Sequence, residues 1–246
     1  MDRLIYTAMS GAKHILEQQA TTAHNLANAT STGFKSQIDS FIAVPMVGSG
    51  LPTRAFVVDA TAGADFTPGP IQSTNRDLDV AVQGKGWLVV QRADGSEGYT
   101  RNGSLKVSQN GQLETATGLT IMGDGGPISI PPDVTISIAK DGTISSISNN
   151  TLPGPSNALG RLKLVNPTEA NLVRAEDGLF VNKNGSTEQA DASVNVISGA
   201  LEASNVNVID AMVTMISLAR QFETQMKLMQ SAENNANKAS QIMSLT

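Results

Sequence analysis

Several residue types are missing from this chain or scarce in it. No cysteine occurs among its 246 residues, which excludes disulfides, thiol nucleophiles and cysteine-ligated zinc. Charged residues make up only 16% of the chain, and the formal net charge of −5 leaves no basic surface that would favour nucleic acid as a partner. No run of about 18 apolar residues occurs, so we expect no insertion into a membrane.

The N-terminus also lacks the pattern of a secretory signal. Lys13 and Glu17 interrupt the stretch where an unbroken apolar segment and a small-residue cleavage site would lie. We therefore expect that no signal peptide is cleaved from this chain.

Glycine and proline are confined almost entirely to the middle of the sequence. Of 22 glycines, all but Gly11 lie between Gly33 and Gly199, and all 10 prolines lie between Pro45 and Pro167. Because these residues interrupt helices, their distribution predicts two helical ends around a central region rich in turns.

The N-terminal region predicts one helix or two stacked helices. Apolar residues recur at helical spacing from Ile5 to Leu16 and resume at Ala23 after a polar gap. The run Thr30-Ser31-Thr32-Gly33 then supplies residues that prefer caps and turns, so the helix should end there.

The C-terminal region predicts a longer helix from about Asn207 to Met243, with Asn207 as N-cap and Asp210 in the first turn. At about 1.5 Å per residue it would be roughly 55 Å long. Its apolar residues step by four and three, which is the seam of a coiled coil: Val208, Met212, Met215, Ala219, Phe222, Met226 and Met229.

The middle of the chain predicts antiparallel β-structure. Strand-like runs occur at 78–82, 87–91, 104–107, 128–130, 135–138 and 161–165. Dipeptides typical of tight hairpins punctuate the region: Asp94-Gly95, Asn102-Gly103, Asn110-Gly111, Asp124-Gly125, Asp141-Gly142, Asp177-Gly178 and Asn184-Gly185. The expected fold class is therefore α+β, with a β-rich body between two helical ends.

The predicted C-terminal helix indicates assembly, because it is poor in charge. Only six residues from Ser204 to Thr246 are charged. Burial of one apolar stripe would contribute about 10–15 kcal/mol, whereas ordering the backbone costs about 1–2 kcal/mol per residue. Further burial must come from the N-terminal helix and from other copies of the protein. The simpler alternative is that the two helices only pair with each other or cover the β body.

The segment Asn25-Leu26-Ala27-Asn28-Ala29-Thr30-Ser31-Thr32-Gly33-Phe34-Lys35 resembles the N-terminal signature of the flagellar rod and hook protein family. The resemblance continues, in order, at residues 65–72, at 78–84 with Trp87, and at 199–206. The length of the chain argues against the hook protein, and the short segment 35–53 argues against the distal rod protein. A subunit of the proximal rod is therefore expected, with another axial protein of the family, distal rod or hook type, as the alternative.

This resemblance implies a multidomain fold and a structural role. Residues 1–34 and 201–246 would form a discontinuous coiled-coil domain inside a tube, residues 35–75 an extended linker with a β segment, and residues 76–200 a β-rich outer domain. The chain would assemble with itself and other rod proteins into the helical drive shaft for motility. It would leave the cytoplasm through the flagellar type III export apparatus and reside in the periplasmic space.

The residues expected to form the assembly interface lie in the two helical ends. In the C-terminal helix we expect the seam to pack against one face of the N-terminal helix. Asn25, Asn28 and Gly33 should shape the turn after the first helix, although the two asparagines could equally bind the backbone of a neighbour. The expected interface comprises Ile5, Ala8, Ala12, Ile15, Asn25, Leu26, Asn28, Gly33, Met212, Met215, Ala219, Phe222, Met226 and Met229.

Catalytic chemistry finds little support in the sequence. The only histidines, His14 and His24, lie in the first predicted helix without a carboxylate motif beside them, and the β region has none. A β-rich carbohydrate-active enzyme would need clustered carboxylates, and an adhesive module would need clustered exposed aromatics. We expect no catalytic residue, cofactor or metal.

Overall fold

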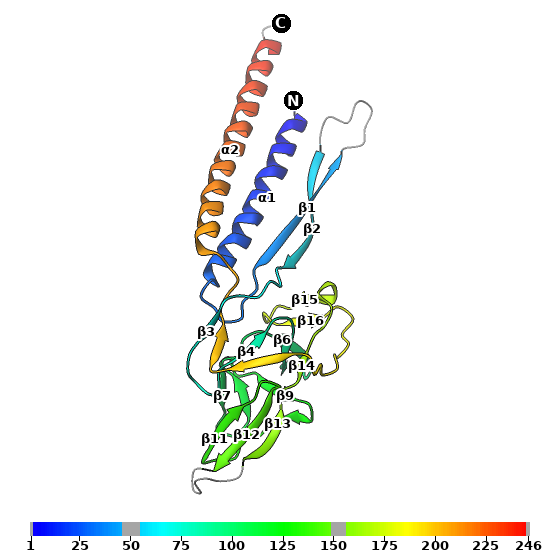
Figure 1. The fold of residues 1–246 in the computed structure, drawn as a ribbon. Coiled ribbons are helices and arrows are strands. Elements are labelled where there is room, and N and C mark those ends of the chain that lie inside the picture. Colours follow the sequence, from blue (N-terminus) through cyan, green and yellow to red (C-terminus); the bar gives the residue numbers. More distant parts are fainter. Residues whose placement is uncertain (1, 46–54, 149–155, 245–246) are drawn as a thin grey trace. The chain divides into compact units, whose positions relative to one another are not determined.

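The fold of the chain is known from a computed structural model, which describes residues 2–45, 55–148 and 156–244. Two helices and an antiparallel β-rich body make up the described chain (Figure 1), which confirms the predicted α+β class. The chain divides into two compact units. The helical unit comprises Met1–Ala29, Ser36–Asp65 and Val206–Thr246, and the β unit comprises Thr30–Lys35 and Phe66–Asn205.

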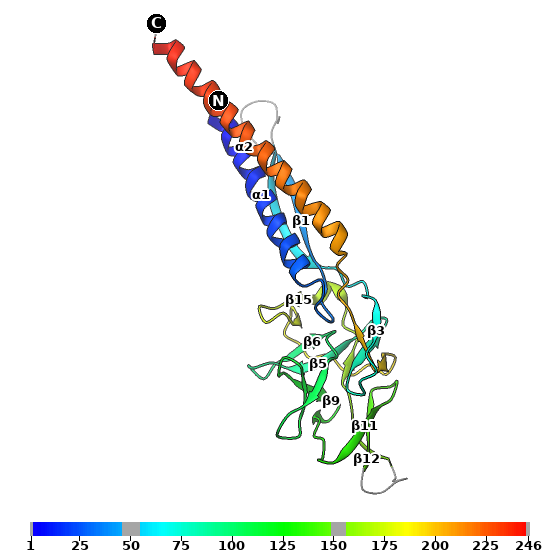
Figure 2. The ribbon, with the colours of Figure 1, turned by 90° about the vertical axis from the view of Figure 1, so that its left-hand side faces the viewer.

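The helical unit is built around helix α1, Asp2–Ala27. One helix, not two, spans the N-terminal region. Helix α2, Val208–Ser244, contacts α1, and so does a hairpin of strands β1, Gln37–Pro45, and β2, Ala55–Ala64 (Figure 2). The hairpin was not predicted as a paired element, although its strands fall in the segment expected to contain a β segment.

Local hydrogen bonds mark the start of α2 and the end of α1. The Asn207 side chain accepts hydrogen bonds from the backbone N–H groups of Ile209 (3.0 Å) and Asp210 (3.4 Å), which confirms it as the N-cap of α2. At the end of α1, the backbone N–H of Asn28 donates to the carbonyl of His24 over 3.2 Å. The chain then leaves the helix through a turn, as the run of small polar residues predicts.

The β unit contains one large sheet and three small ones, and every ladder is antiparallel. The main sheet runs in the order β15 (Leu172–Arg174), β16 (Phe180–Asn182), β6 (Glu97–Thr100), β5 (Trp87–Gln91), β9 (Thr120–Gly123), β8 (Leu113–Thr115) and β7 (Leu105–Val107). Strands β10, Gly126–Pro127, and β14, Leu164–Val165, join it at the side.

The remaining strands form short separate sheets. A three-stranded meander joins β11 (Val134–Ile138), β12 (Thr143–Ser148) and β13 (Asn157–Arg161). Strand β4 (Val80–Gln83) pairs with β17 (Asn195–Ser198), and β3 (Ile71–Ser73) pairs with β18 (Ala200–Glu202). A single 3-10 turn covers Glu169–Asn171.

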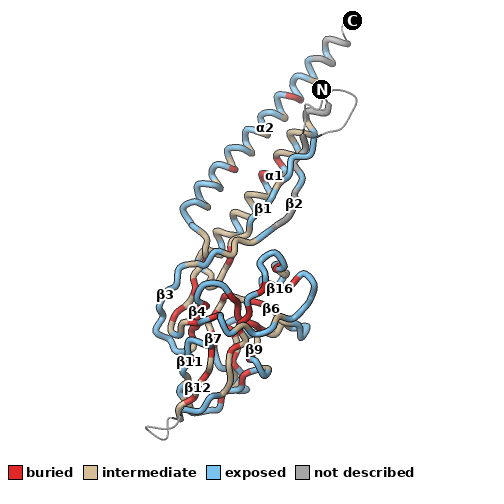
Figure 3. The backbone as a smooth tube through the Cα atoms, turned by 45° about the vertical axis from the view of Figure 1, so that its right-hand side comes forward, coloured by how far each residue is buried: buried red, intermediate tan, exposed pale blue. Residues whose placement is uncertain are grey.

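One hydrophobic cluster holds the β unit together, and its buried positions concentrate in the lower part of Figure 3. Side chains from the main sheet and the meander meet there, so the short strands share a single core. Its members are Val80, Val82, Leu88, Val90, Leu105, Leu113, Ile121, Ile128, Ile130, Ile138, Ile144, Leu162, Leu164, Leu179, Val194 and Val196.

Most of the predicted turns and strands are present. The runs at 87–91 and 135–138 are strands β5 and part of β11. The run at 128–130 is not a strand but forms an isolated antiparallel bridge, in which Ser129 lies opposite Gln112, and Ile128 and Ile130 lie in the core. Five of the seven turn dipeptides place their glycine at positive φ: Gly95, Gly111, Gly142, Gly178 and Gly185. No helix in the described residues is long and apolar enough to cross a membrane.

Candidate assembly interface

The face of α2 that is withdrawn from solvent follows a heptad-like spacing. The described positions of α2 that are not exposed are Ala211, Met215, Leu218, Ala219, Phe222, Gln225, Met229, Ala232 and Ala236. Apart from Ala219, they alternate steps of four and three, and Leu218 and Ala232 are buried. The Gln225 side chain lies beside Gly11 of α1, so this face is turned toward α1.

Part of the predicted seam occupies this face. Met215, Ala219, Phe222 and Met229 are half-buried, whereas Met212 is 50% exposed and Met226 is 47% exposed. The face of α2 that is withdrawn from solvent also includes Gln225 and several alanines. The prediction did not include most of these residues, because it followed large apolar side chains. Small side chains let two helices approach closely, so alanines contribute to helix packing although they are only weakly hydrophobic.

The predicted residues of α1 lie on its covered side. Ala12 and Ile15 are buried, and Ile5, Ala8 and Leu26 are half-buried. Part of this covering comes from the hairpin, because the His14 ring meets Phe41 of β1 edge-on with centroids 5.5 Å apart. Helix α1 is therefore covered from two directions, by α2 and by the hairpin, whereas Tyr6, Met9 and Leu16 remain exposed.

An open groove lies where α2 passes the start of α1. It has a volume of about 800 Å³ and is lined by Ile5, Phe222, Glu223, Met226, Lys227, Met229, Gln230 and Glu233. Four of these eight residues belong to the predicted interface. Its lining combines apolar side chains with Glu223, Lys227 and Glu233, a mixture that is typical of protein interfaces.

A second apolar surface covers the first turns of α2. Ile209 is 73% exposed, Val213 62% and Ile216 55%, and Met212 lies beside them. At about 100° per residue these four side chains lie roughly opposite the face turned toward α1. This surface, here called the outer apolar face, was not part of the predicted seam except for Met212.

Asn25 fastens the end of α1 to the start of the hairpin. Its Nδ2 donates to the carbonyl of Gln37 over 2.9 Å, and its Oδ1 accepts the backbone N–H of Gln37 over 2.8 Å. The side chain thus pairs with the backbone as a neighbouring strand would. Asn28 instead turns back on its own helix, where its Nδ2 donates to the carbonyl of His24 over 3.0 Å.

Gly33 belongs to the β unit, where it lies directly against the backbone of the body. Its φ is +68°, and a Cβ there would lie 2.3 Å from the Arg101 carbonyl carbon. Its N–H donates to the Glu202 carbonyl over 2.7 Å. A glycine is required for both reasons, since left-handed backbone is costly for other residues and no space exists for a side chain.

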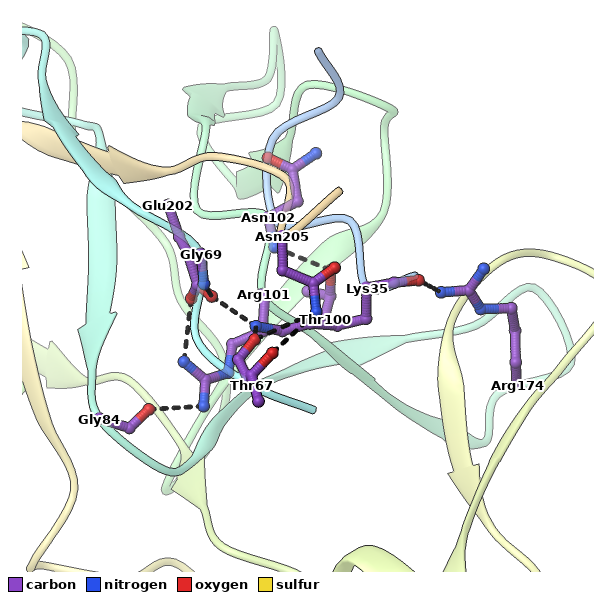
Figure 4. A network of polar contacts seen from close by, with 10 residues as sticks. All are labelled: Lys35, Thr67, Gly69, Gly84, Thr100, Arg101, Asn102, Arg174, Glu202 and Asn205. Atoms are coloured by element: carbon purple, nitrogen blue, oxygen red, sulfur yellow. Dashed lines mark hydrogen bonds and ion pairs between the residues drawn. The ribbon is translucent and has the colours of Figure 1, made fainter. Parts of the chain in front are cut away.

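Three buried charged side chains, those of Lys35, Arg101 and Glu202, meet in the β unit (Figure 4). The Glu202 carboxylate is 2.6 Å from Lys35 Nζ and 2.9 Å from Arg101 Nη1, and all three side chains are at most 3% exposed. Further hydrogen bonds complete the group: Gly69 N–H donates to Glu202, Lys35 donates to the Thr67 carbonyl, and Arg101 donates to the Gly84 carbonyl. We call Lys35, Arg101 and Glu202 the buried charge cluster.

Arg174, on strand β15 of the main sheet, contacts Phe34 and Lys35 in the segment Thr30–Lys35. Its guanidinium lies 4.7 Å from the Phe34 ring centre and 5.1 Å from that of Phe180, and it donates to the Lys35 carbonyl (Figure 4). Burial lowers the pKa of Arg174 from its ordinary value. The segment Thr30–Lys35 is therefore held by side chains from several strands.

Comparison with known proteins finds three matching family models. The model for the flagella basal body rod protein matches residues 5–35, that for the flagellar hook protein FlgE/F/G D1 domain matches 81–146, and that for the flagellar basal body rod FlgEFG protein C-terminal matches 197–242. The flagellar basal-body rod protein FlgF of Escherichia coli K12 is 48% identical over the full length of both chains. The chain belongs to the flagellar basal-body rod protein family.

Other relatives agree with this assignment. FlgF of Salmonella typhimurium LT2 is 47% identical over both full lengths, and the rod protein FlgG of Borreliella burgdorferi is 28% identical over 95% of this chain and 96% of its own. Within the family the chain is most like FlgF. It is thus a structural subunit of the basal-body rod and not an enzyme.

The three family segments each supply one member of the buried charge cluster. Lys35 ends the first segment, Arg101 lies in the second, and Glu202 lies in the third. This cluster was not predicted from the sequence. A signal was present, since Lys35 is the first Lys, Arg, Asp or Glu after Glu17 and Glu202 is the only one between Asp191 and Asp210.

Proposed function

We propose that this rod protein is a proximal rod subunit whose helices α1 and α2 form a coiled-coil inner domain that lines the tube. The sequence assigns residues 1–34 and 201–246 to that domain, residues 76–200 to the outer β-rich domain and residues 35–75 to the link between them. Because Thr30–Lys35 and Phe66–Asn205 lie in the compact β unit, we group residues 30–34 and 201–205 with the outer domain. Hairpin β1–β2 is part of residues 35–75 but belongs to the helical unit. We therefore group the hairpin with the inner domain.

The outer apolar face of α2 carries this proposal. Ile209, Val213 and Ile216 are each more than half exposed, on a helix that contains few charges. Covering each large apolar side chain contributes about 1.5–3 kcal/mol, so a neighbouring subunit gains several kcal/mol by packing there. The open groove at Phe222 and Met229 offers a second place for a neighbour on the opposite side of the helix.

The residues of the predicted interface then divide into two roles. Ala12, Ile15, Met215 and Ala219 are withdrawn from solvent within one chain and hold the helix pair together. Met212 and Met226, which are about half exposed, are available to other subunits. The flexible methionine side chain suits contacts with neighbours that are not identical to one another.

The test is incorporation into the rod. Cells that carry only Ile216→Glu should lose motility, and basal bodies purified from them should lack this chain, while the β unit of the purified variant keeps its native spectrum. Ser231→Glu places the same charge on an exposed polar position of α2 and should be incorporated. Normal motility of cells with Ile216→Glu would show that the outer apolar face is not needed for assembly.

The route of the chain to the rod belongs to the same proposal. We infer that it passes through the flagellar type III export apparatus without cleavage of a signal peptide and that it lies in the periplasmic space with other rod proteins. Mass spectrometry of the chain in purified basal bodies should recover peptides from the first residues of α1. Their absence from incorporated chains would contradict export without processing.

A further inference from the structure

Helix α1 keeps an exposed stripe of side chains beside α2 and the hairpin. The members are exposed and follow one another at alternating steps of three and four residues: Tyr6, Met9, Lys13, Leu16, Ala20, Ala23 and Ala27. Only Lys13 among them carries a charge, and Tyr6 is 55% exposed and Met9 54%. Steps of three and four are the spacing at which a second helix packs along the first. We call these residues the α1 stripe.

The outer apolar face of α2 begins a second stripe with the same spacing. Its members are all exposed: Ile209, Val213, Ile216, Arg220, Glu223 and Lys227. At about 100° per residue, this stripe lies about 170° around α2 from the face turned toward α1. We call it the α2 stripe, and it is apolar in its first half and charged in its second half.

We propose that the α1 stripe of one copy packs against the α2 stripe of the next copy, so that α1 and α2 helices alternate along a row of subunits. This pairing rests on the assembly role proposed above for the outer apolar face, and it names the surface that covers that face. Three features of the helical unit support it: the levels of the two stripes, their charges and their directions.

The contact between α1 and α2 inside one chain sets the levels of the two stripes. A Cβ on Gly11 would lie 3.5 Å from the Gln225 side chain, and Ile5 lines the open groove together with Met229. The two helices are therefore antiparallel (Figure 1), and each residue later in α1 is level with one residue earlier in α2. A neighbouring copy that is displaced sideways, without a shift along the helices, keeps these levels.

At these levels the stripes match small side chains with large ones. The alanines of the α1 stripe face the branched side chains of the α2 stripe: Ala27 faces Ile209, Ala23 faces Val213 and Ala20 faces Ile216. Alanines let the two helices approach closely, so the large side chains fill the space between them.

The charges match at the same levels. Lys13, whose side chain is 73% exposed, is level with Glu223, the only acidic residue of the α2 stripe. Within its own helix Lys13 pairs with Glu17 over 3.5 Å, at the surface. Arg220 and Lys227 are level with apolar residues of the α1 stripe, which their aliphatic stems cover.

The directions of the two stripes make the row open. Two copies that closed on each other would form a four-helix bundle, in which each helix has its two neighbours roughly 90° apart. Helix α2 instead has α1 on one side and the α2 stripe about 170° away. The contact joins different surfaces of two copies and does not close after two, so it repeats from copy to copy.

The first test is disulfide trapping in basal bodies purified from cells that carry only the variant chain. The chain has no cysteine, so introduced residues supply its only thiols. Ala23→Cys with Val213→Cys places two thiols at one level on neighbouring copies, whereas Val213 points away from α1 within one chain. Oxidation of the thiols with diamide should give dimers and longer products on a non-reducing gel.

The matched control uses the same two stripes at different levels. Ala27→Cys with Ile216→Cys separates the thiols by seven residues, or about 10 Å, along the helices. That separation is too large for a disulfide, so this variant should give no cross-linked products.

The second test reverses the charges. Glu223→Lys leaves only cations across the contact, so the amount of this chain in purified basal bodies should fall about tenfold or more. Adding Lys13→Glu restores an opposite pair and should recover the lost incorporation. Within one chain both residues point away from the contact of α1 with α2, so recovery can arise only between copies.

Four results would overturn this pairing. They are an incorporated test chain that gives no cross-link, products that stop at dimers, cross-links in the control, and no recovery in the double charge reversal. If the test chain is not incorporated, the charge reversal decides alone. In the first case the chain is still in the rod, so its assembly role stands and only the pairing fails, whereas normal motility of cells with Ile216→Glu would contradict the assembly role itself.

Discussion

Gly103→Ala should be far more harmful than Gly95→Ala, although both glycines follow an Asn or Asp in a predicted hairpin dipeptide. A Cβ on Gly103 would lie 1.7 Å from the Val80 carbonyl oxygen, and that oxygen belongs to backbone that cannot rotate away. Nothing lies within 4 Å of a Cβ on Gly95, whose φ is +82°. From the sequence the two glycines would be expected to respond alike to substitution, whereas the structure predicts different losses of stability.

The magnitudes follow from what each substitution displaces. To accept a methyl group at Gly103, strand β4 must move away by more than an ångström. This breaks the hydrogen bond from Val80 N–H to the Gly103 carbonyl, worth about 1 kcal/mol, and opens the core at Val80 and Leu105, which costs about 2–5 kcal/mol. The total is about 3–6 kcal/mol, against about 1–2 kcal/mol for a left-handed alanine at position 95.

The assay is urea unfolding followed by the fluorescence of Trp87, the only tryptophan, which is buried in the same unit. The midpoint should fall much further for Gly103→Ala than for Gly95→Ala, with similar slopes for both. A Gly103→Ala variant that unfolds at the same urea concentration as Gly95→Ala would refute the close approach of the two backbones.

Two further predictions concern Tyr99 and Asn25. Burial raises the pKa of Tyr99, so the folded chain keeps that proton when the unfolded chain loses it, and stability should fall as the pH rises above about 10. The difference in absorbance at 295 nm between the chain and Tyr99→Phe should titrate above that pH, and a midpoint at or below it would contradict the burial. Asn25→Asp removes the donor to the Gln37 carbonyl and sets two oxygens against each other, so the Gln37 amide should exchange faster than in Asn28→Asp. Equal exchange in the two variants would show that the side chain of Asn25 does not hold the hairpin.

The helical ends and the antiparallel body were predictable because they depend on local features. Glycine and proline exclude long helices from the middle of the chain, and Asn-Gly and Asp-Gly dipeptides favour tight turns wherever they occur. The cap at Asn207 is equally local, and it was found at the expected residue.

The features that sequence reasoning missed depend on long-range packing. The face of α2 turned toward α1 includes Gln225 and alanines, because the fit against Gly11 selects small or flexible residues there. Which residues of hairpin β1–β2 are buried depends on how the hairpin packs against α1, so its pattern is not visible in the sequence of the two strands alone. The buried charge cluster joins residues 35, 101 and 202, and its only sequence signal is the isolation of two of its charges.

The position of Glu202 near the end of the chain has a consequence for synthesis and quality control. A chain grows from its N-terminus, so Thr30–Lys35 exists long before the carboxylate that holds it. A chain that stops short of residue 202 lacks the carboxylate that pairs with Lys35 and the carbonyl that accepts the Gly33 N–H. The β unit is therefore complete only when the polypeptide has reached the start of α2.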